Sequence, residues 1–459
     1  MADQIGPHMA TSGPIMDMRV LRPPKIKEAR ARLEKGEISA DELRKVEDME
    51  IEKVVHKQAS VGLKLATDGE FRRSWWHFDF LSHLTGCELF HPDMGIQFAG
   101  VTTKAESVRV VGKVGFSSHP HVEHFKYLKA HARVTPKMTI PAPSTLHFRQ
   151  GRASIDRKVY PELDAYFDDV AMAYRKAIRA FYDAGCRYLQ MDDTAWSMIC
   201  DPKEREHSRE RGDDPDSLPA KYAAMTNKAL EGKPADMVIS MHSCRGNFRS
   251  TFIASGGYDF VAEQLLGEVD LDGYFLEYDT ERAGGFEPLR FVPKGKKTVV
   301  LGLVTSKSGK LETKDSIKRR IDEATKYVAL DQLCLSPQCG FASTEEGNTL
   351  TEDEQWAKLR LIVEVADEVL AAIDAVNPQI NAFCFVDPEA TRHAAKESER
   401  RYRDGATLGP LDGVPASIKD VFLSKGQPTF RGSRLLAEAE GANDPWQLAQ
   451  LERAFQRSE

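Results

Sequence analysis

Two cysteines, a histidine and a glutamate carry the clearest chemistry in this chain of 459 residues. His242 and Cys244 stand in a His-Ser-Cys triplet, and Glu277 and Cys339 follow later in the chain. Imidazole nitrogen, thiolate sulfur and carboxylate oxygen are ligands that zinc takes in tetrahedral sites. Because side chains alternate along a strand, His242 and Cys244 would point the same way, and one metal ion could bind both. The set therefore predicts a zinc site at His242, Cys244, Glu277 and Cys339.

A structural role is the alternative for each of these residues taken singly. Free cysteines are often small buried hydrophobic residues, and a buried histidine is often a core residue with satisfied hydrogen bonds. The spacing is also unlike the local pattern of a zinc finger. What favours the metal is that all of these residues follow predicted strands.

Acidic residues follow two other apolar runs in the same way. Asp68 and Glu70 come after the first run, and Asp192 and Asp193 come after the fourth. A barrel of parallel strands fills its interior with apolar side chains and places its chemistry at the carboxyl ends of the strands. We therefore expect these acids to lie at the same mouth as the metal ligands. Capping of the barrel end or simple surface charge is the alternative for isolated acids.

Short apolar runs alternate with amphipathic stretches through most of the chain. This order predicts an α/β fold, for which a (β/α)8 TIM barrel is the economical closure and an open doubly wound sheet is the alternative. Helices are predicted most clearly at 159–183 and 313–327. The eight predicted strands are 63–67, 107–114, 137–140, 188–191, 237–241, 273–276, 298–303 and 330–335. The second of them could instead form a hairpin beside the barrel.

The chain on either side of these runs has a different pattern. Residues 1–21 show no periodicity and predict an irregular lead-in. Apolar residues at helical spacing between 24 and 62 predict an N-terminal extension of two helices, with Ser39 and Asp41 available as caps. The barrel pattern of 22–370 ends before the segment 371–459, which we expect to be a truncated α/β segment.

Composition limits the partners of the protein. Lys and Arg number 63 against 70 Asp and Glu, for a net charge of -7 without a basic block, so we expect no nucleic-acid partner. No run of about 18 apolar residues and no signal-like start are present, so we expect no membrane partner and a cytoplasmic location. An odd count of 7 cysteines favours free thiols in a reducing compartment. Small molecules are the expected partners, and nothing indicates an oligomeric state.

Five motifs resemble the catalytic domain of cobalamin-independent methionine synthase, in a short single-barrel form. They are Thr67-Asp68-Gly69-Glu70-Phe71-Arg72-Arg73, Trp75-Trp76-His77-Phe78-Asp79, Leu189-Gln190-Met191-Asp192-Asp193, Met241-His242-Ser243-Cys244 and Leu335-Ser336-Pro337-Gln338-Cys339-Gly340. The resemblance covers residues 22–370. It implies a (β/α)8 barrel with zinc on the same four residues that the chemistry above selects.

The resemblance also implies a reaction. Zinc would convert the thiol of homocysteine to a thiolate, which takes a methyl group and forms methionine. The family's usual donor is polyglutamylated 5-methyltetrahydrofolate. Glu70 and Asp192 would hold the ammonium group of the acceptor. A platform for the donor or for a carboxylate is predicted at Arg72, Trp75, Trp76 and His77, although the tryptophans could equally pack their own loop.

The sequence departs from the family at three places. The Asp and His that assist the leaving group are missing after the seventh strand, where Lys307 takes the position of the histidine. The tryptophan that stacks on the folate is missing from 139–144, and Met18-Arg19-Val20 replaces the Gly-Ser pair before the first Leu-Arg-Pro. Two alternatives follow. One is zinc-dependent alkyl transfer to another thiol, as in epoxyalkane:coenzyme M transferases, and the other is a noncatalytic zinc-binding or thiol-binding protein.

Residues 372–383 and 409–420 resemble a second family, the amidase signature family. Lys419 matches the catalytic lysine of the Ser-Ser-Lys triad in that family. Both serines of the triad belong to a stretch that the family places farther downstream than the last residue of this sequence. We therefore expect 371–459 to be an incomplete amidase fragment, fused to the barrel and without amidase activity.

Overall fold

The computed structural model describes residues 19–380, with side chains described as far as residue 371. Contacts between residues divide the chain into two units, with the boundary between Val369 and Leu370. The sheet belongs to the first unit. Most of the predicted lead-in and of the predicted amidase fragment, including Lys419, lies outside the described residues.

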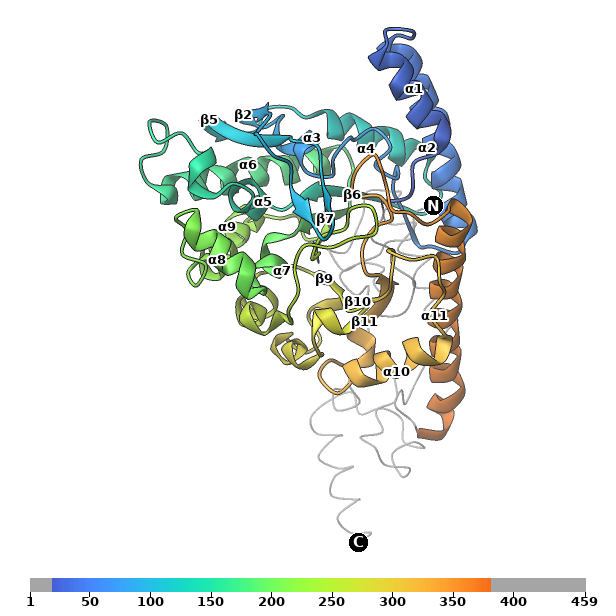
Figure 1. The fold of residues 1–459 in the computed structure, drawn as a ribbon. Helices are drawn as coiled ribbons and strands as arrows, with labels where there is room; N and C mark the ends of the chain where they lie inside the picture. Colours follow the sequence, from blue (N-terminus) through green and yellow to red (C-terminus); the bar gives the residue numbers. More distant parts are fainter. Residues whose placement is uncertain (1–18, 381–459) are drawn as a thin grey trace, which may run out of the picture. The chain divides into compact units, whose positions relative to one another are not determined.

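Seven parallel strands form one curled sheet at the centre of the first unit (Figure 1). Each strand pairs with the next one in the order β1-β6-β7-β8-β9-β10-β11, which confirms the predicted α/β class. Within residues 19–380 no ladder joins β1 to β11. The strands are β1 (Leu65–Ala66), β6 (Thr135–Pro141), β7 (Tyr188–Asp193), β8 (Val238–Ser243), β9 (Gly273–Glu277), β10 (Thr298–Val304) and β11 (Leu333–Pro337).

The strands of this sheet are buried because both of their faces are covered. Every residue of β7 through β11 is buried, as is typical of parallel sheets. Gly302 of β10 has no room for a side chain, since a Cβ there would lie 2.7 Å from the Cα of Gln338 and 2.8 Å from the carbonyl oxygen of Leu276. The chain beyond β11 can therefore pass close to the end of β10.

Residues 107–114 do not form a barrel strand, and the predicted alternative of a hairpin beside the barrel is confirmed. These residues belong to β5 (Ser107–Gly115), which pairs antiparallel with β2 (Thr85–Phe90) in a separate two-stranded sheet. The physical reason is visible in the sequence, because buried and exposed residues largely alternate along β5 as they do in a sheet with one face in water. A second small hairpin joins β3 (Gln97–Phe98) to β4 (Val101–Thr102).

Helices cover the sheet and fill most of the connections between its strands. They are α1 (Pro24–Glu34), α2 (Ala40–Ser60), α3 (Phe78–Leu81), α4 (Pro120–His131), α5 (Pro143–Phe148), α6 (Leu163–Asp183), α7 (Ala195–Ile199), α8 (Pro202–Glu210), α9 (Leu218–Leu230), α10 (Lys314–Ala324) and α11 (Glu352–Ile380). Short 3-10 helices lie at Gly151–Ser154, Tyr258–Phe260, Glu281–Ala283, Glu287–Phe291 and Leu330–Gln332, and a π-helix lies at Glu263–Glu268.

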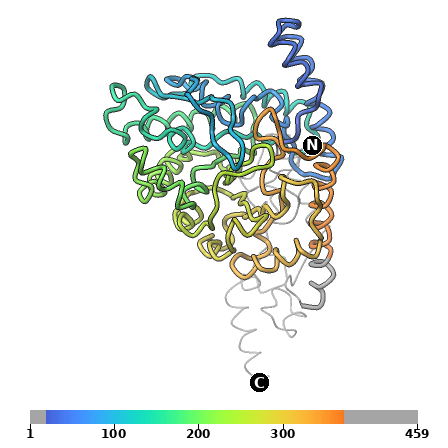
Figure 2. Tube along the Cα trace, viewed as in Figure 1, coloured from blue at the N-terminus to red at the C-terminus, as the bar shows by residue number. Residues whose placement is uncertain are grey.

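The N-terminal pair of helices forms as predicted. Ser39 caps α2 in a capping box, in which its side chain accepts from the Glu42 N–H and the Glu42 side chain accepts from the Ser39 N–H. Asp41 lies in the first turn of α2 and not at the cap. Helix α2 lies beside the start of α11, where Lys57 Nζ is 3.2 Å from Glu352 Oε1 (Figure 2). No helix among the described residues is long and apolar enough to span a membrane.

A buried histidine, His119, starts helix α4. Its Nδ1 accepts a hydrogen bond from the His121 N–H at 3.1 Å, and its Nε2 lies 3.1 Å from the carbonyl oxygen of Phe80. The rings of His83 and His121 lie 5.4 and 4.6 Å from the His119 ring, and the charge of Arg73 is close enough to act on it. Burial lowers the pKa of His119 to about 3, so the folded protein keeps the neutral ring.

This geometry predicts a loss of stability in acid. The unfolded chain takes up a proton at His119 below about pH 6.5, whereas the folded chain does so only near its lower pKa, so stability falls as the pH decreases between these values. The variant His119→Asn keeps a side-chain acceptor at the cap but does not titrate. The free energy of unfolding in urea, measured from pH 7 to pH 5, should fall less steeply in this variant, by at most about 1.4 kcal/mol per pH unit. Equal slopes would contradict the assignment.

Candidate metal centre

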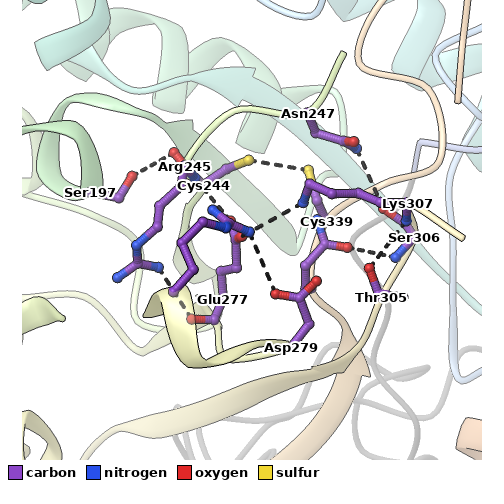
Figure 3. Close-up of polar contacts among 12 residues, drawn as sticks. Ser197, Cys244, Arg245, Asn247, Glu277, Asp279, Thr305, Ser306, Lys307 and Cys339 are labelled. Atoms are coloured by element: carbon purple, nitrogen blue, oxygen red, sulfur yellow. Dashed lines mark hydrogen bonds and ion pairs between the residues drawn. The ribbon is translucent and has the colours of Figure 1, made fainter. Parts of the chain in front are cut away.

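The sulfur atoms of Cys244 and Cys339 lie 3.5 Å apart at the carboxyl end of the sheet (Figure 3). Cys244 directly follows β8, and Cys339 follows β11. His242 of β8 offers a nitrogen at the same place, since the ligand atoms of the three residues lie within 4.8 Å of one another. All three side chains are buried. The structure thus brings together three of the four residues that the sequence predicts as metal ligands.

Backbone hydrogen bonds fix both cysteines at the ends of their strands. The Cys244 N–H donates to the carbonyl oxygen of Asp193 at the end of β7, at 3.0 Å. The N–H of Gln338, the residue before Cys339, donates to the carbonyl oxygen of Val304 at the end of β10, at 2.8 Å. The sheet therefore fixes the main chain from which both sulfur atoms project.

The donor set of this cluster fits a metal ion. Burial raises the pKa of the Cys339 thiol, and its hydrogen bond with the Cys244 thiol raises it further. A divalent cation has the opposite effect, because it stabilises the thiolate directly. One imidazole and two thiols that are all buried match the nitrogen and sulfur ligands that zinc prefers. His242, Cys244 and Cys339 form a candidate metal site.

Glu277, the fourth predicted ligand, lies at the end of β9 but outside this three-residue cluster. Its carboxylate accepts a hydrogen bond from the Arg245 N–H at 2.9 Å and forms ion pairs with Arg282 and with Lys307, whose Nζ is 3.6 Å away. Burial alone would raise the pKa of Glu277, but Lys307, Arg282 and Arg245 together lower it to about 2. The carboxylate is therefore ionised and held by cations.

Lys307 follows β10 and is buried beside Glu277 and Asp279 (Figure 3). Burial alone would lower the pKa of Lys307, but the two carboxylates raise it above its ordinary value. The side chain therefore carries a positive charge at neutral pH. The structure places this predicted residue at the edge of the metal cluster.

Glu70 and Asp192 are both buried near the same end of the sheet, as the sequence predicts. The Thr139 hydroxyl donates to Glu70 Oε1 at 2.5 Å, and Arg73 Nη1 lies 3.1 Å from the same oxygen. Asp192 Oδ2 lies 3.8 Å from Arg19 Nη2. Burial raises the pKa of Glu70 above its ordinary value. The charges of Arg73 and Arg19 oppose this increase, and the charge of Asp192 adds to it. These are acids that favour a cationic group between them.

The backbone of Glu70 is in the left-handed region, with φ of 59°, where residues other than glycine are rare. Gly69 before it has φ of 68°. The turn is held by a hydrogen bond from the Glu70 N–H to Asp68 Oδ1 at 2.9 Å, and by one from the Arg73 N–H to the Glu70 carbonyl oxygen at 3.0 Å. The turn after β1 is thus fixed by hydrogen bonds on both sides of Glu70.

A small cavity of about 20 Å³ adjoins the metal cluster. It includes the predicted residues Trp75, Trp76, Asp192, His242 and Cys244 in its lining. The full lining is Arg19, Trp75, Trp76, Ile96, Phe98, Arg149, Asp192, Asp193, Thr194, His242, Cys244, Gly246, Asn247, Phe248, Ser343 and Thr344. The cavity therefore combines aromatic surface, two arginines and two acids beside the sulfur atoms.

Two residues of the predicted platform lie elsewhere. Arg72 forms an ion pair with Asp48 of α2 and lies 4.9 Å from the centre of the Tyr127 ring. His77 is fully buried between the rings of Trp76 and Phe78, with centroid distances of 4.4 and 3.8 Å. Neither residue lines the cavity.

Several residues of the cavity lining have no predicted role in the sequence, among them Arg19, Arg149, Asn247 and Phe248. Asn247 donates to the Gly340 carbonyl oxygen at 2.6 Å and so ties the loop after β8 to the loop after β11. Asn247 lies only three residues after the predicted ligand Cys244, and this closeness in sequence could have identified it as a site residue. Arg19 is visible there only as a departure from the resembled family.

Comparison with known proteins identifies the family to which the chain belongs. Residues 22–368 match the family model for the catalytic domain of cobalamin-independent synthase. The chain therefore belongs to this family of methyltransferases. The uncharacterized protein YxjH of Bacillus subtilis (strain 168) is 54% identical over 351 residues, which cover 76% of this chain and 92% of that protein.

A solved structure from Listeria monocytogenes supports the same assignment. It is described as a "Putative Vitamin-B12 Independent Methionine Synthase", and it is 43% identical with a TM-score of 0.63. The match covers 78% of this chain and 99% of that structure.

The end of the chain matches a different family. Residues 364–454 match the amidase family model. One component of the glutamyl-tRNA(Gln) amidotransferase of Chloroflexus aggregans (strain MD-66 / DSM 9485) is 45% identical over 91 residues, which cover 20% of this chain and 18% of that protein. The predicted resemblance to two families, one after the other, is confirmed.

The cluster predicts the effect of removing one sulfur. Cys339→Ala should lose bound zinc, because one of the closely placed ligands is gone. Zinc content of the purified full chain, measured by atomic absorption, is the readout. Cys334→Ala is the matched control, since Cys334 is also buried on β11 but does not belong to the cluster. Lys419→Ala should likewise keep its zinc. Full zinc content in Cys339→Ala would contradict the ligand assignment.

Proposed function

We propose that this protein is a zinc-dependent S-methyltransferase that methylates homocysteine to methionine. The observation that carries the proposal is the placement of His242, Cys244 and Cys339 within 4.8 Å of one another, at the end of the sheet where Glu70 and Asp192 are buried. Membership of the cobalamin-independent synthase family supports methyl transfer. The donor that we propose is 5-methyltetrahydrofolate.

Four residues would hold the zinc ion. His242, Cys244 and Cys339 have the required closeness, and Glu277 would complete the set from the neighbouring strand β9. Bound zinc lowers the pKa of a thiol that binds to it, so that a reactive thiolate is available at neutral pH. The cations around Glu277 keep its carboxylate ionised and ready to act as a ligand.

The two buried acids would recognise the amino end of the acceptor. A buried carboxylate is costly unless a cation pairs with it, so an ammonium group is a favourable ligand for Asp192 and Glu70. This feature favours an amino-acid thiol over the uncharged or sulfonated thiols of the alternative alkyl-transfer reaction. Glu70 has the closer ion pair, with Arg73 Nη1 at 3.1 Å, whereas Arg19 Nη2 lies 3.8 Å from Asp192, so we propose Asp192 as the main contact.

The donor would approach from the aromatic side of the cavity. Trp75 and Trp76 line the cavity, and we propose that a planar ring of the donor packs against them. Methyl transfer forms a sulfur–carbon bond and breaks a carbon–nitrogen bond of the donor, so the leaving nitrogen must gain a proton. Lys307 is a buried cation beside the cluster, and we propose it as the source of that proton. Arg72 and His77 would support the loop that carries the tryptophans.

One experiment tests the acceptor and the metal together. X-ray absorption at the zinc edge, recorded on the full chain with and without homocysteine, should show one additional sulfur neighbour when homocysteine is present. Formation of methionine from 5-methyltetrahydrofolate is then followed by mass spectrometry. An additional sulfur without methionine would mean a different donor. An unchanged zinc environment would contradict homocysteine as the acceptor and leave another thiol or a noncatalytic role.

The ammonium contact predicts a specific kinetic defect. Asp192→Asn should raise the KM for homocysteine about tenfold or more, because a charged hydrogen bond contributes about 1.5 to 3 kcal/mol. Asp315→Asn is the control, since Asp315 is an exposed residue in the first turn of α10. The initial rate of methionine formation at varied homocysteine is the measurement. An unchanged KM would contradict the role of Asp192.

A further inference from the structure

Arg19 places a buried positive charge beside the metal cluster. Its side chain is 3% exposed, and its Nη2 lies 3.8 Å from Asp192 Oδ2 and 3.9 Å from Cys339 Sγ. The guanidinium also lies 5.5 Å from the centre of the Trp76 ring. One nitrogen of the chain itself thus stands close to both an acid and a sulfur of the site.

The backbone of Arg19 is held in place by its neighbours. Its carbonyl oxygen accepts from the Phe341 N–H at 2.5 Å, and a Cβ at Gly340 would lie 2.5 Å from the Arg19 Cβ. The Leu21 N–H donates to Gln355 Oε1 at 2.7 Å. Because the main chain is fixed, the position of the guanidinium can change only by rotation of the side chain.

We propose that Arg19 is an internal competitor of the acceptor, and that its guanidinium must leave Asp192 before the acceptor can bind. This inference rests on the proposed function, in which the acceptor reaches from Asp192 to the metal at Cys339. Arg19 Nη2 lies less than 4 Å from both ends of that path, which are Asp192 Oδ2 and Cys339 Sγ. The same place cannot hold both groups.

The size of the cavity supports this inference. A volume of about 20 Å³ is room for roughly one water molecule and is too small for an amino-acid thiol. Arg19 is part of the cavity lining, and rotation of its side chain would enlarge the space next to Asp192 and the sulfur atoms.

Charge balance makes the exchange feasible for an amino thiol. Removing one partner of a buried ion pair is strongly destabilising, because the other charge is left without compensation. The ammonium group of homocysteine replaces the charge that Arg19 withdraws from Asp192. The affinity that is measured is then reduced by the fraction of molecules in which Arg19 still occupies the site.

Calorimetric titration of homocysteine into the zinc-loaded full chain tests the proposal. Arg19→Ala and Arg19→Gln should each bind homocysteine about tenfold more tightly than the parent, as expected if the open state is a minority of about a tenth. Arg290→Ala, at a half-exposed side chain outside the cavity lining, is the control and should not change the affinity. The melting temperature of each variant shows that it is folded.

The other outcomes separate this inference from the proposed function. Weaker binding in both Arg19 variants would overturn the competitor role and make Arg19 a direct contact of the acceptor. Equal binding in all proteins would overturn the competitor role and leave homocysteine as the acceptor. A lack of binding in the parent and in every variant would overturn both the acceptor and the competitor.

Discussion

The parallel ladder from β7 to β11 is the constraint on which the rest of the site depends. It aligns the carboxyl ends of neighbouring strands, so residues from distant parts of the sequence meet at one edge. Gly302 is a point of close approach in this arrangement, because a Cβ there would lie 2.7 Å from the Cα of Gln338. The approach of the loop after β11 to β10, and with it the position of Cys339, follows from that missing side chain.

Charge at this edge is organised in pairs. Glu277 is held by Arg282 and Lys307, and Glu70 is held by Arg73. Burial of so many ionised groups is tolerable only because each has a partner of opposite sign. A site of this kind can accept a charged ligand by exchanging one ion-pair partner for another. The free-energy cost of this exchange is smaller than the cost of leaving a buried charge without a partner.

Much of the fold could be predicted from the sequence, since buried parallel strands are continuous apolar runs and amphipathic helices have a clear period. The exception is β5, which was predicted as a barrel strand although its residues largely alternate between buried and exposed and it pairs with β2. In the site, His242, Cys244 and Cys339 were predictable because each lies at or just after the carboxyl end of a strand. The contacts of Glu277 and of Arg72 were not, because ion pairs with Arg282 and Asp48 depend on side-chain positions that no local pattern encodes.

The left-handed backbone at Glu70 lowers the stability of the folded protein. A residue with a Cβ is disfavoured in that conformation by about 1 to 2 kcal/mol relative to glycine. A chain optimised only for folding would carry glycine at this turn, as it does one residue earlier at Gly69. The carboxylate at position 70 is therefore held at a cost in stability, and backbone strain of this kind occurs preferentially at functional sites.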